Sequence, residues 1–208
     1  MKQLIIIFFL LNIAKAETAK IPFASKNNSV EFTIANTGFI PTTLSVKVEN
    51  LPHGITIKNN STQEISLNSN EEKTITLNFS VEKTAPVNTE QKFTIVVQST
   101  NGEEWKKEIT YTILAPEKFE LQQNYPNPFN PTTTITYQLP TNGFVQLVIY
   151  NTLGQEISKL AEQEQTAGYH QQQWNASSVS SGMYIYECRY KNESGKTEVF
   201  RKRMMLVK

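Results

Sequence analysis

Residue types on which many enzymes and metal sites depend are scarce or missing in this chain of 208 residues. It contains no aspartate, so all 19 acidic side chains are glutamates, which excludes a Ser-His-Asp triad and an aspartate-based metal site. The two histidines, His53 and His170, fall in different predicted domains and do not form a pair of metal ligands. With eight glycines the chain has no glycine-rich phosphate loop. We therefore expect no catalytic residue, no metal and no cofactor.

Cysteine is nearly absent as well. Cys188 is the single cysteine, so no disulfide can form within the chain. It falls on the same face of a predicted strand as Tyr184 and Tyr186, and nothing near it in the sequence would lower the pKa of its thiol. We expect a buried, inert thiol and not a nucleophile.

The sequence has one long apolar run, and it lies near Met1. Lys2 precedes about ten apolar residues from Leu4 to Ile13, and Ala14-Lys15-Ala16 places small residues at positions −3 and −1 of a cleavage site. This pattern predicts a secretory signal peptide over residues 1–16, cleaved after Ala16. The run is shorter than the roughly 20 residues of a transmembrane helix, and no later segment approaches that length, so no transmembrane segment is expected.

An excess of charge of one sign is also missing. Without Lys2 and Lys15 the chain has 18 basic and 19 acidic residues, and such near-neutrality argues against nucleic acid as a partner. Only the last residues depart from this balance. There a local excess of +4 arises from Lys191, Lys196, Arg201, Lys202, Arg203 and Lys208 against Glu193 and Glu198. These charges either protect the solvated edge of a last strand, which the residues alone favour, or take part in recognition.

Alternation of apolar and polar residues with a period of two dominates residues 17–116. Turn residues such as Asn36-Thr37-Gly38, Pro52-His53-Gly54 and Asn101-Gly102 separate the alternating segments. About seven short strands in about 100 residues predict an Ig-like antiparallel β-sandwich. The alternating segments are 30–34, 44–48, 55–57, 65–67, 75–81, 93–97 and 105–113. Residues 51–55 also loosely resemble Ig-like modules found beside bacterial surface and carbohydrate-active domains.

A domain boundary is expected at Ala115-Pro116-Glu117-Lys118, where proline ends a strand and two charges expose the junction. Residues 117–208 predict a second β-sandwich, so the fold class is all-β with two tandem Ig-like antiparallel sandwiches after a signal peptide. Its strands are expected over 133–139, 144–150, 156–160, 168–174, 183–190 and 197–207. Trp174 and the row of tyrosines after Met183 are expected in the core, because so small a domain needs them there.

A proline-rich segment precedes this second sandwich. Three prolines within six residues fix φ and remove backbone donors, which excludes a helix or a central strand. The asparagines between them can form Asx-turns, and Tyr125 and Phe129 are expected to be apolar plugs that press onto a sheet. A flexible linker is the other interpretation, but this segment carries aromatics, lacks serine and glycine, and continues directly into a strand.

This segment and the residues after it resemble the type A C-terminal sorting domain of the type IX (Por) secretion system. The matching segments are Asn124–Pro131, Ile135–Tyr137, Leu139-Pro140, Val145–Glu156, Ala167–His170, Trp174-Asn175, Ser181–Tyr186 and Lys202–Lys208. The same domain is similar to the Ig-like domain of flagellar hook-capping proteins, whose scaffolds are not expected to carry a signal peptide. The residues of the sorting motif are Asn124, Tyr125, Pro126, Asn127, Pro128, Phe129, Asn130, Pro131, Gly154, Gly182, Lys202 and Lys208.

The resemblance implies an exported protein of the cell surface or the medium. The type IX translocon would recognise the sorting domain as a folded unit, with its last strand contributing, after transport through the periplasm. A sortase-like peptidase would then cut near residues 115–123, and the passenger would be released or attached to an anionic lipopolysaccharide. A structural, adhesive or ligand-binding passenger is expected. The alternative is an accessory module, for example a carbohydrate-binding one, or the remnant of a larger secreted hydrolase.

Overall fold

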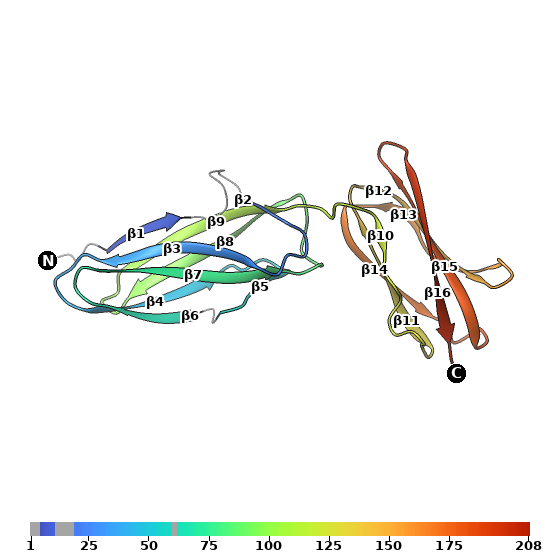
Figure 1. The fold of residues 1–208 in the computed structure, drawn as a ribbon, viewed down its shortest axis with the longest axis horizontal. Coiled ribbons are helices and arrows are strands. Elements are labelled where there is room, and N and C mark those ends of the chain that lie inside the picture. The colour runs from blue at the N-terminus through green and yellow to red at the C-terminus, as the bar shows by residue number, and fades with distance from the viewer. Residues whose placement is uncertain (1–4, 11–18, 60–61) are drawn as a thin grey trace. The chain divides into compact units, whose positions relative to one another are not determined.

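The computed structural model describes residues 5–10, 19–59 and 62–208 as parts of two compact units, Met1–Leu114 and Ala115–Lys208 (Figure 1). The division falls two residues before the boundary expected from the sequence. Strands make up the regular structure of the described residues, which include no helix that could span a membrane. The all-β class with Ig-like β-sandwich domains is thus confirmed.

Two sheets face each other in the first unit. One has the strand order β1-β3-β7-β5 and the other β2-β9-β8-β4-β6, and every pairing is antiparallel except that of β2 with β9. The strands are β1 (Ile5–Leu10), β2 (Ala19–Ile21), β3 (Asn28–Asn36), β4 (Thr42–Glu49), β5 (Ile55–Ile57), β6 (Thr62–Leu67), β7 (Glu71–Val81), β8 (Glu90–Ser99) and β9 (Glu104–Ile113).

The core of the first unit follows from the period-two pattern. Alternate residues of β3, β7 and β8 are buried, and the rings of Phe79, Phe93 and Tyr111 pack in series with centroids 6.2 and 5.8 Å apart. The seven expected strands correspond to β3 through β9. The sequence pattern missed β2, because Ala19–Ile21 contains one large apolar residue and so shows no clear alternation.

Strand β1 falls within the predicted signal peptide. In the full chain its backbone pairs with β3, from Ile5 opposite Asn36 to Leu10 opposite Glu31. The expected cleavage position after Ala16 lies outside the described residues. The signal peptide therefore stays a prediction.

The second unit is a smaller sandwich with strand orders β10-β11-β14 and β13-β12-β15-β16. Its strands are β10 (Glu120–Leu121), β11 (Thr132–Leu139), β12 (Gly143–Asn151), β13 (Glu156–Gln165), β14 (Gly168–Asn175), β15 (Gly182–Asn192) and β16 (Thr197–Leu206). Trp174 and the tyrosines of β15 are buried between the sheets, as expected, together with Cys188. Strand β13 runs five residues beyond its predicted end. These extra residues are mostly exposed, since β13 is an edge strand, and so they show little apolar alternation.

Candidate functional site

The proline-rich part of the sorting motif, here called the proline segment (residues 122–131), connects β10 to β11. The Tyr125-Pro126 and Asn127-Pro128 peptide bonds are cis. The backbones of Tyr125 and Thr134 exchange two hydrogen bonds of 2.9 Å, which fix the first half of the segment against β11. The proline segment is therefore an ordered part of the unit and not a linker.

Asn124 is the buried polar centre of the proline segment. Its Nδ2 donates to the carbonyl of Pro126 at 3.0 Å and to the hydroxyl of Thr133 at 2.9 Å, while its Oδ1 accepts from Nε2 of Gln123 at 2.7 Å. The Thr133 hydroxyl also donates to the Pro126 carbonyl at 2.8 Å. Because proline has no N–H, these side chains supply the donors that the backbone of the turn lacks.

The hydroxyl of Tyr186, in β15, ties this segment to the core. It accepts from the backbone N–H of Asn124 and donates to the carbonyl of Gln122, both at 2.9 Å. Burial raises the pKa of Tyr186 to about 12, so the hydroxyl keeps its proton at neutral pH and stays a donor.

Phe129 joins the proline segment to β16, the last strand. Its N–H donates to the carbonyl of Met205 and its carbonyl accepts from the N–H of Val207, both at 3.0 Å, so that it forms a parallel bridge with Leu206. Its ring is 2% exposed and lies 5.6 Å from the ring of Trp174. Phe129 is thus both a backbone partner of β16 and a core residue.

Two further side chains hold the same stretch of β16. Oδ1 of Asn127 accepts from the N–H of Met205 at 3.0 Å, and Nε2 of Gln123 donates to the carbonyl of Arg203 at 2.8 Å. We call this set the β16 contact: Gln123, Asn127 and Phe129 with the backbone of residues 203–207. It brings the two ends of the second unit together.

The rest of the proline segment faces solvent. Tyr125 is 81% exposed, so the expectation that it would be a buried plug like Phe129 is wrong. The backbone of Tyr125 is used by its bridge to Thr134, and this bridge leaves the ring outside the sheet. Pro126, Asn127, Pro128 and Asn130 are exposed as well. The motif therefore combines a buried frame with a solvent-exposed surface.

The basic residues near residue 208 have separate surroundings. Nζ of Lys208 donates to the carbonyl of Ser177 at 2.7 Å, and its backbone N–H donates to the hydroxyl of Ser181 at 3.0 Å. Lys202 is half-buried in β16 and lies opposite Tyr186 of β15. Arg201, Lys202, Arg203 and Lys208 thus lie in or just after β16, close in sequence to the β16 contact, whereas Lys191 and Lys196 lie at the other end of the β15–β16 hairpin.

The two motif glycines lie in different places. Gly182 begins β15 opposite Leu206, the same residue that forms the bridge to Phe129. Gly154 has φ +80° in the β12–β13 turn, where Oδ1 of Asn151 accepts from the N–H groups of Leu153 and Gln155 at 3.0 Å. Gly154 therefore supplies the left-handed conformation that this turn requires.

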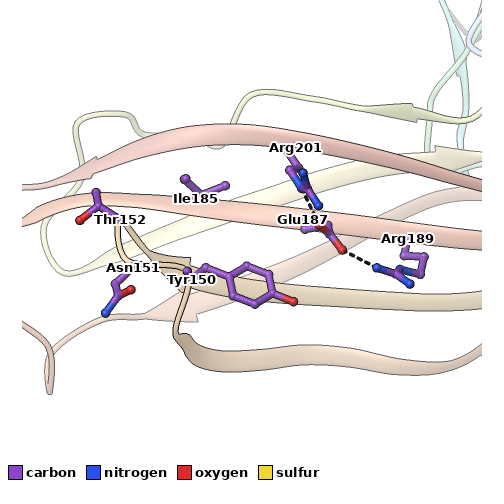
Figure 2. A pocket seen from close by; sticks show the side chains of 8 residues that line it. Tyr150, Asn151, Thr152, Ile185, Glu187, Arg189 and Arg201 are labelled. Carbon is purple, nitrogen blue, oxygen red and sulfur yellow. Dashed lines mark hydrogen bonds and ion pairs between the residues drawn. The ribbon is translucent and has the colours of Figure 1, made fainter.

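The sequence reading missed an ionic cluster on the outer face of β15 and β16. Glu187, whose side chain is 7% exposed, contacts Nε of Arg201 at 2.5 Å and a guanidinium nitrogen of Arg189 at 3.1 Å (Figure 2). These residues and Tyr150 line an open hollow of about 380 Å³. Burial opposes ionisation of Glu187, but the two guanidiniums outweigh it and hold the pKa of the carboxyl below its usual range.

Groups that could carry catalysis are dispersed. His170 stacks on Tyr137 with ring centroids 5.5 Å apart, and burial raises the pKa of the Cys188 thiol to about 12. Among the described residues, no three potential metal-ligating side chains form a group.

Family comparisons assign both units. Residues 123–202 match the secretion system C-terminal sorting domain, and residues 24–116 match the Ig-like fold at the C-terminal of FixG. The chain therefore consists of an Ig-like domain followed by a type IX sorting domain, and both are non-catalytic domain types. The sorting domain indicates export by the type IX secretion system and a location at the cell surface or outer membrane. The matched range ends at Lys202, before the residues of β16 that touch the proline segment.

Solved structures resemble the chain only distantly. The CupB2 chaperone of Pseudomonas aeruginosa has 11% identity and a TM-score of 0.30, over 91% of this chain and 99% of that one. Dimeric latent PorU from Porphyromonas gingivalis has 11% identity and a TM-score of 0.37, over 98% of this chain but 20% of that one. The YadV chaperone has 12% identity and a TM-score of 0.32, over 96% and 99%. Among curated proteins, none matches the chain.

Proposed function

We propose that the chain is a non-enzymatic exported protein, in which residues 1–16 direct it to the periplasm and the second unit is the signal for the type IX translocon. The β16 contact is the observation that carries this proposal. It places the exposed side of the proline segment beside the basic last strand, so that both form one surface of a folded unit. The translocon would recognise that surface.

An export assay in a bacterium with a type IX system tests this proposal. Deletion of residues 203–208 removes the strand part of the β16 contact, and we expect the chain to accumulate in the periplasm with a protease-resistant first unit. Q163A is the control, because Gln163 is exposed in β13, outside the segments that resemble the sorting motif. Wild-type amounts of the deleted chain in the medium would refute the proposal.

A sortase-like peptidase would cut the chain between the two units, and the passenger would then be released or attached to an anionic lipopolysaccharide. The connection between β9 and β10 supports cleavage there, since Glu117 and Lys118 are exposed outside any strand. Phe119 is the C-terminal limit of the expected cleavage region, because its ring is buried against that of Tyr190 with centroids 5.2 Å apart. Intact-mass measurement of the secreted protein is expected to show a chain that ends between residues 114 and 118.

A loop at one end of the first unit favours a binding role for the passenger. Phe39 and Ile40 are 85% and 64% exposed in the β3–β4 loop. Nδ2 of the buried Asn36 donates to the carbonyls of Ile40 at 2.8 Å and Asn68 at 2.9 Å, and its Oδ1 accepts from the N–H of Gly38 at 3.0 Å. A loop held in one shape presents apolar side chains at low entropic cost to a ligand or another surface.

Binding of the mature chain to glycan arrays and to bacterial cells tests this role. F39A is expected to lose binding while L153A keeps it, because Leu153 is also an exposed apolar residue but belongs to the other unit. Equal binding by F39A and the wild type would argue against the loop. Hydrolysis of any polymer by the chain would favour the alternative, an accessory module or remnant of a secreted hydrolase.

A further inference from the structure

Removal of the signal peptide would leave β3 without its outer neighbour. In the full chain β3 lies between β1 and β7 (Figure 1), and β1 consists wholly of residues 5–10. Cleavage after Ala16 leaves only Glu17 and Thr18 before Ala19, where β2 begins to pair with β9 of the opposite sheet. The mature chain thus has no segment before β2 long enough to cover β3.

The edge exposed in this way has little of the usual protection of edge strands, because Glu31 is the one charged residue in its nine. β3 has nine residues, pairs with β7 without a register shift, and contains no proline and no lysine. The edge strands β2 and β5 have three residues each, and β6 carries Glu64 at its centre. Natural edge strands are generally short, bulged or charged because a long regular edge pairs readily with another strand. β3 has the character of a strand-pairing site.

We propose that β3 of the mature chain pairs antiparallel with β3 of a second copy, giving one continuous sheet of order β5-β7-β3-β3-β7-β5. The proposal rests on the proposed function in one respect, which is the removal of residues 1–16. Such an interface is isologous, since the same strand contributes from both copies around a two-fold axis. Backbone hydrogen bonds between the two β3 strands would largely fix the antiparallel direction of this pairing.

The sequence of β3 is complementary to itself in one register. With the axis at Phe32, Val30 lies opposite Ile34 of the second copy, so core-facing residues stay on the core side. On the outer face, Glu31 lies opposite Thr33 and no like charges meet. An axis at Glu31 would instead place two carboxylates directly opposite each other. A partner of other sequence would find only small or polar outward side chains here, which favours a second copy as the occupant.

Sedimentation equilibrium of the chain that begins at Glu17, its start verified by intact mass, tests the proposal. We expect twice the monomer mass, with dissociation on dilution. T33E places a carboxylate opposite each Glu31 and is expected to weaken the dimer roughly tenfold or more. E31K/T33E restores opposite charges and is expected to recover the dimer. S66E adds the same charge to the exposed side of β6 and is expected to change nothing.

Cysteine crosslinking checks the register. A mixture of E31C and T33C chains is expected to form a disulfide between copies, whereas either variant alone is not, and the buried Cys188 does not interfere. A monomer at all concentrations, or equal weakening by S66E and T33E, would overturn the proposal. Because the chain is produced without residues 1–16, this result is independent of processing. The intact mass of the secreted protein separately tests whether the leader is removed.

Discussion

Replacement of Phe129 by alanine should destabilise the second unit and loosen β16. The ring is 2% exposed and packs against Trp174, so the substitution removes a buried aromatic side chain and leaves a cavity. Phe-to-Ala changes in cores cost about 3–5 kcal/mol. The backbone hydrogen bonds of Phe129 to residues 205 and 207 do not need the ring, so the loss should come from packing alone.

The size of this effect relative to the unit makes it measurable. A unit of about 94 residues has a free energy of unfolding of roughly 5–14 kcal/mol, so F129A would remove about a fifth of it or more. Urea unfolding of the mature chain in a W105F background makes Trp174 the single tryptophan reporter, because the chain has two tryptophans. The urea midpoint of the transition reported by Trp174 fluorescence should fall. The urea midpoint of the first unit's transition, followed by circular dichroism, should not change.

Y125A is the matched control for this substitution. Tyr125 belongs to the same segment but is 81% exposed, so its loss should change the free energy of unfolding by no more than about 0.5 kcal/mol. A loss below about 1 kcal/mol for F129A, or equal losses for the two variants, would refute the packing role of Phe129.

Three further results are expected. Because the pKa of Glu187 is lowered in the folded state, its ion pairs stabilise the fold fully above the usual glutamate pKa. This contribution is lost as the pH falls through the lower folded-state pKa. The urea midpoints at pH 7 and pH 3 should therefore differ more for the wild type than for E187Q. G54A should destabilise the first unit more than G102A does. Both glycines have positive φ, but a Cβ on Gly54 would lie 2.6 Å from Ala85, whereas a Cβ on Gly102 would meet nothing within 4 Å. Equal melting temperatures of the two variants would contradict this steric argument. Cys188 should resist iodoacetamide at pH 8 in the native chain and react after denaturation; labelling of the folded protein would show that its thiol is accessible.

The strands and cores of both units were predictable because each strand has one buried face. Period-two alternation located β3 through β9 and β11 through β16, and it placed Trp174 and Cys188 in the core correctly. β2 and β10 were missed because each has one large apolar side chain, whereas the equally short β5 has two isoleucines around a threonine.

The candidate site was only partly predictable, because it depends on contacts between distant segments. The prolines of residues 126–131 identify a rigid segment, but not that Phe129 turns inward and Tyr125 outward. That difference follows from which backbone groups bond to β11 and which to β16. The ionic cluster of Glu187 escaped notice because Arg201 becomes its neighbour through the pairing of β15 with β16, which the local sequence does not specify.

Because of the bridge between Phe129 and Leu206, the structure around the exposed proline motif depends on synthesis of the chain through Leu206. A ribosome must have translated residue 206 before the second unit can close, so a polypeptide that stops earlier presents the prolines without their supporting strand. An exporter that engages the closed unit would then pass only chains synthesised through Leu206, so one parallel bridge would make export depend on the presence of that strand.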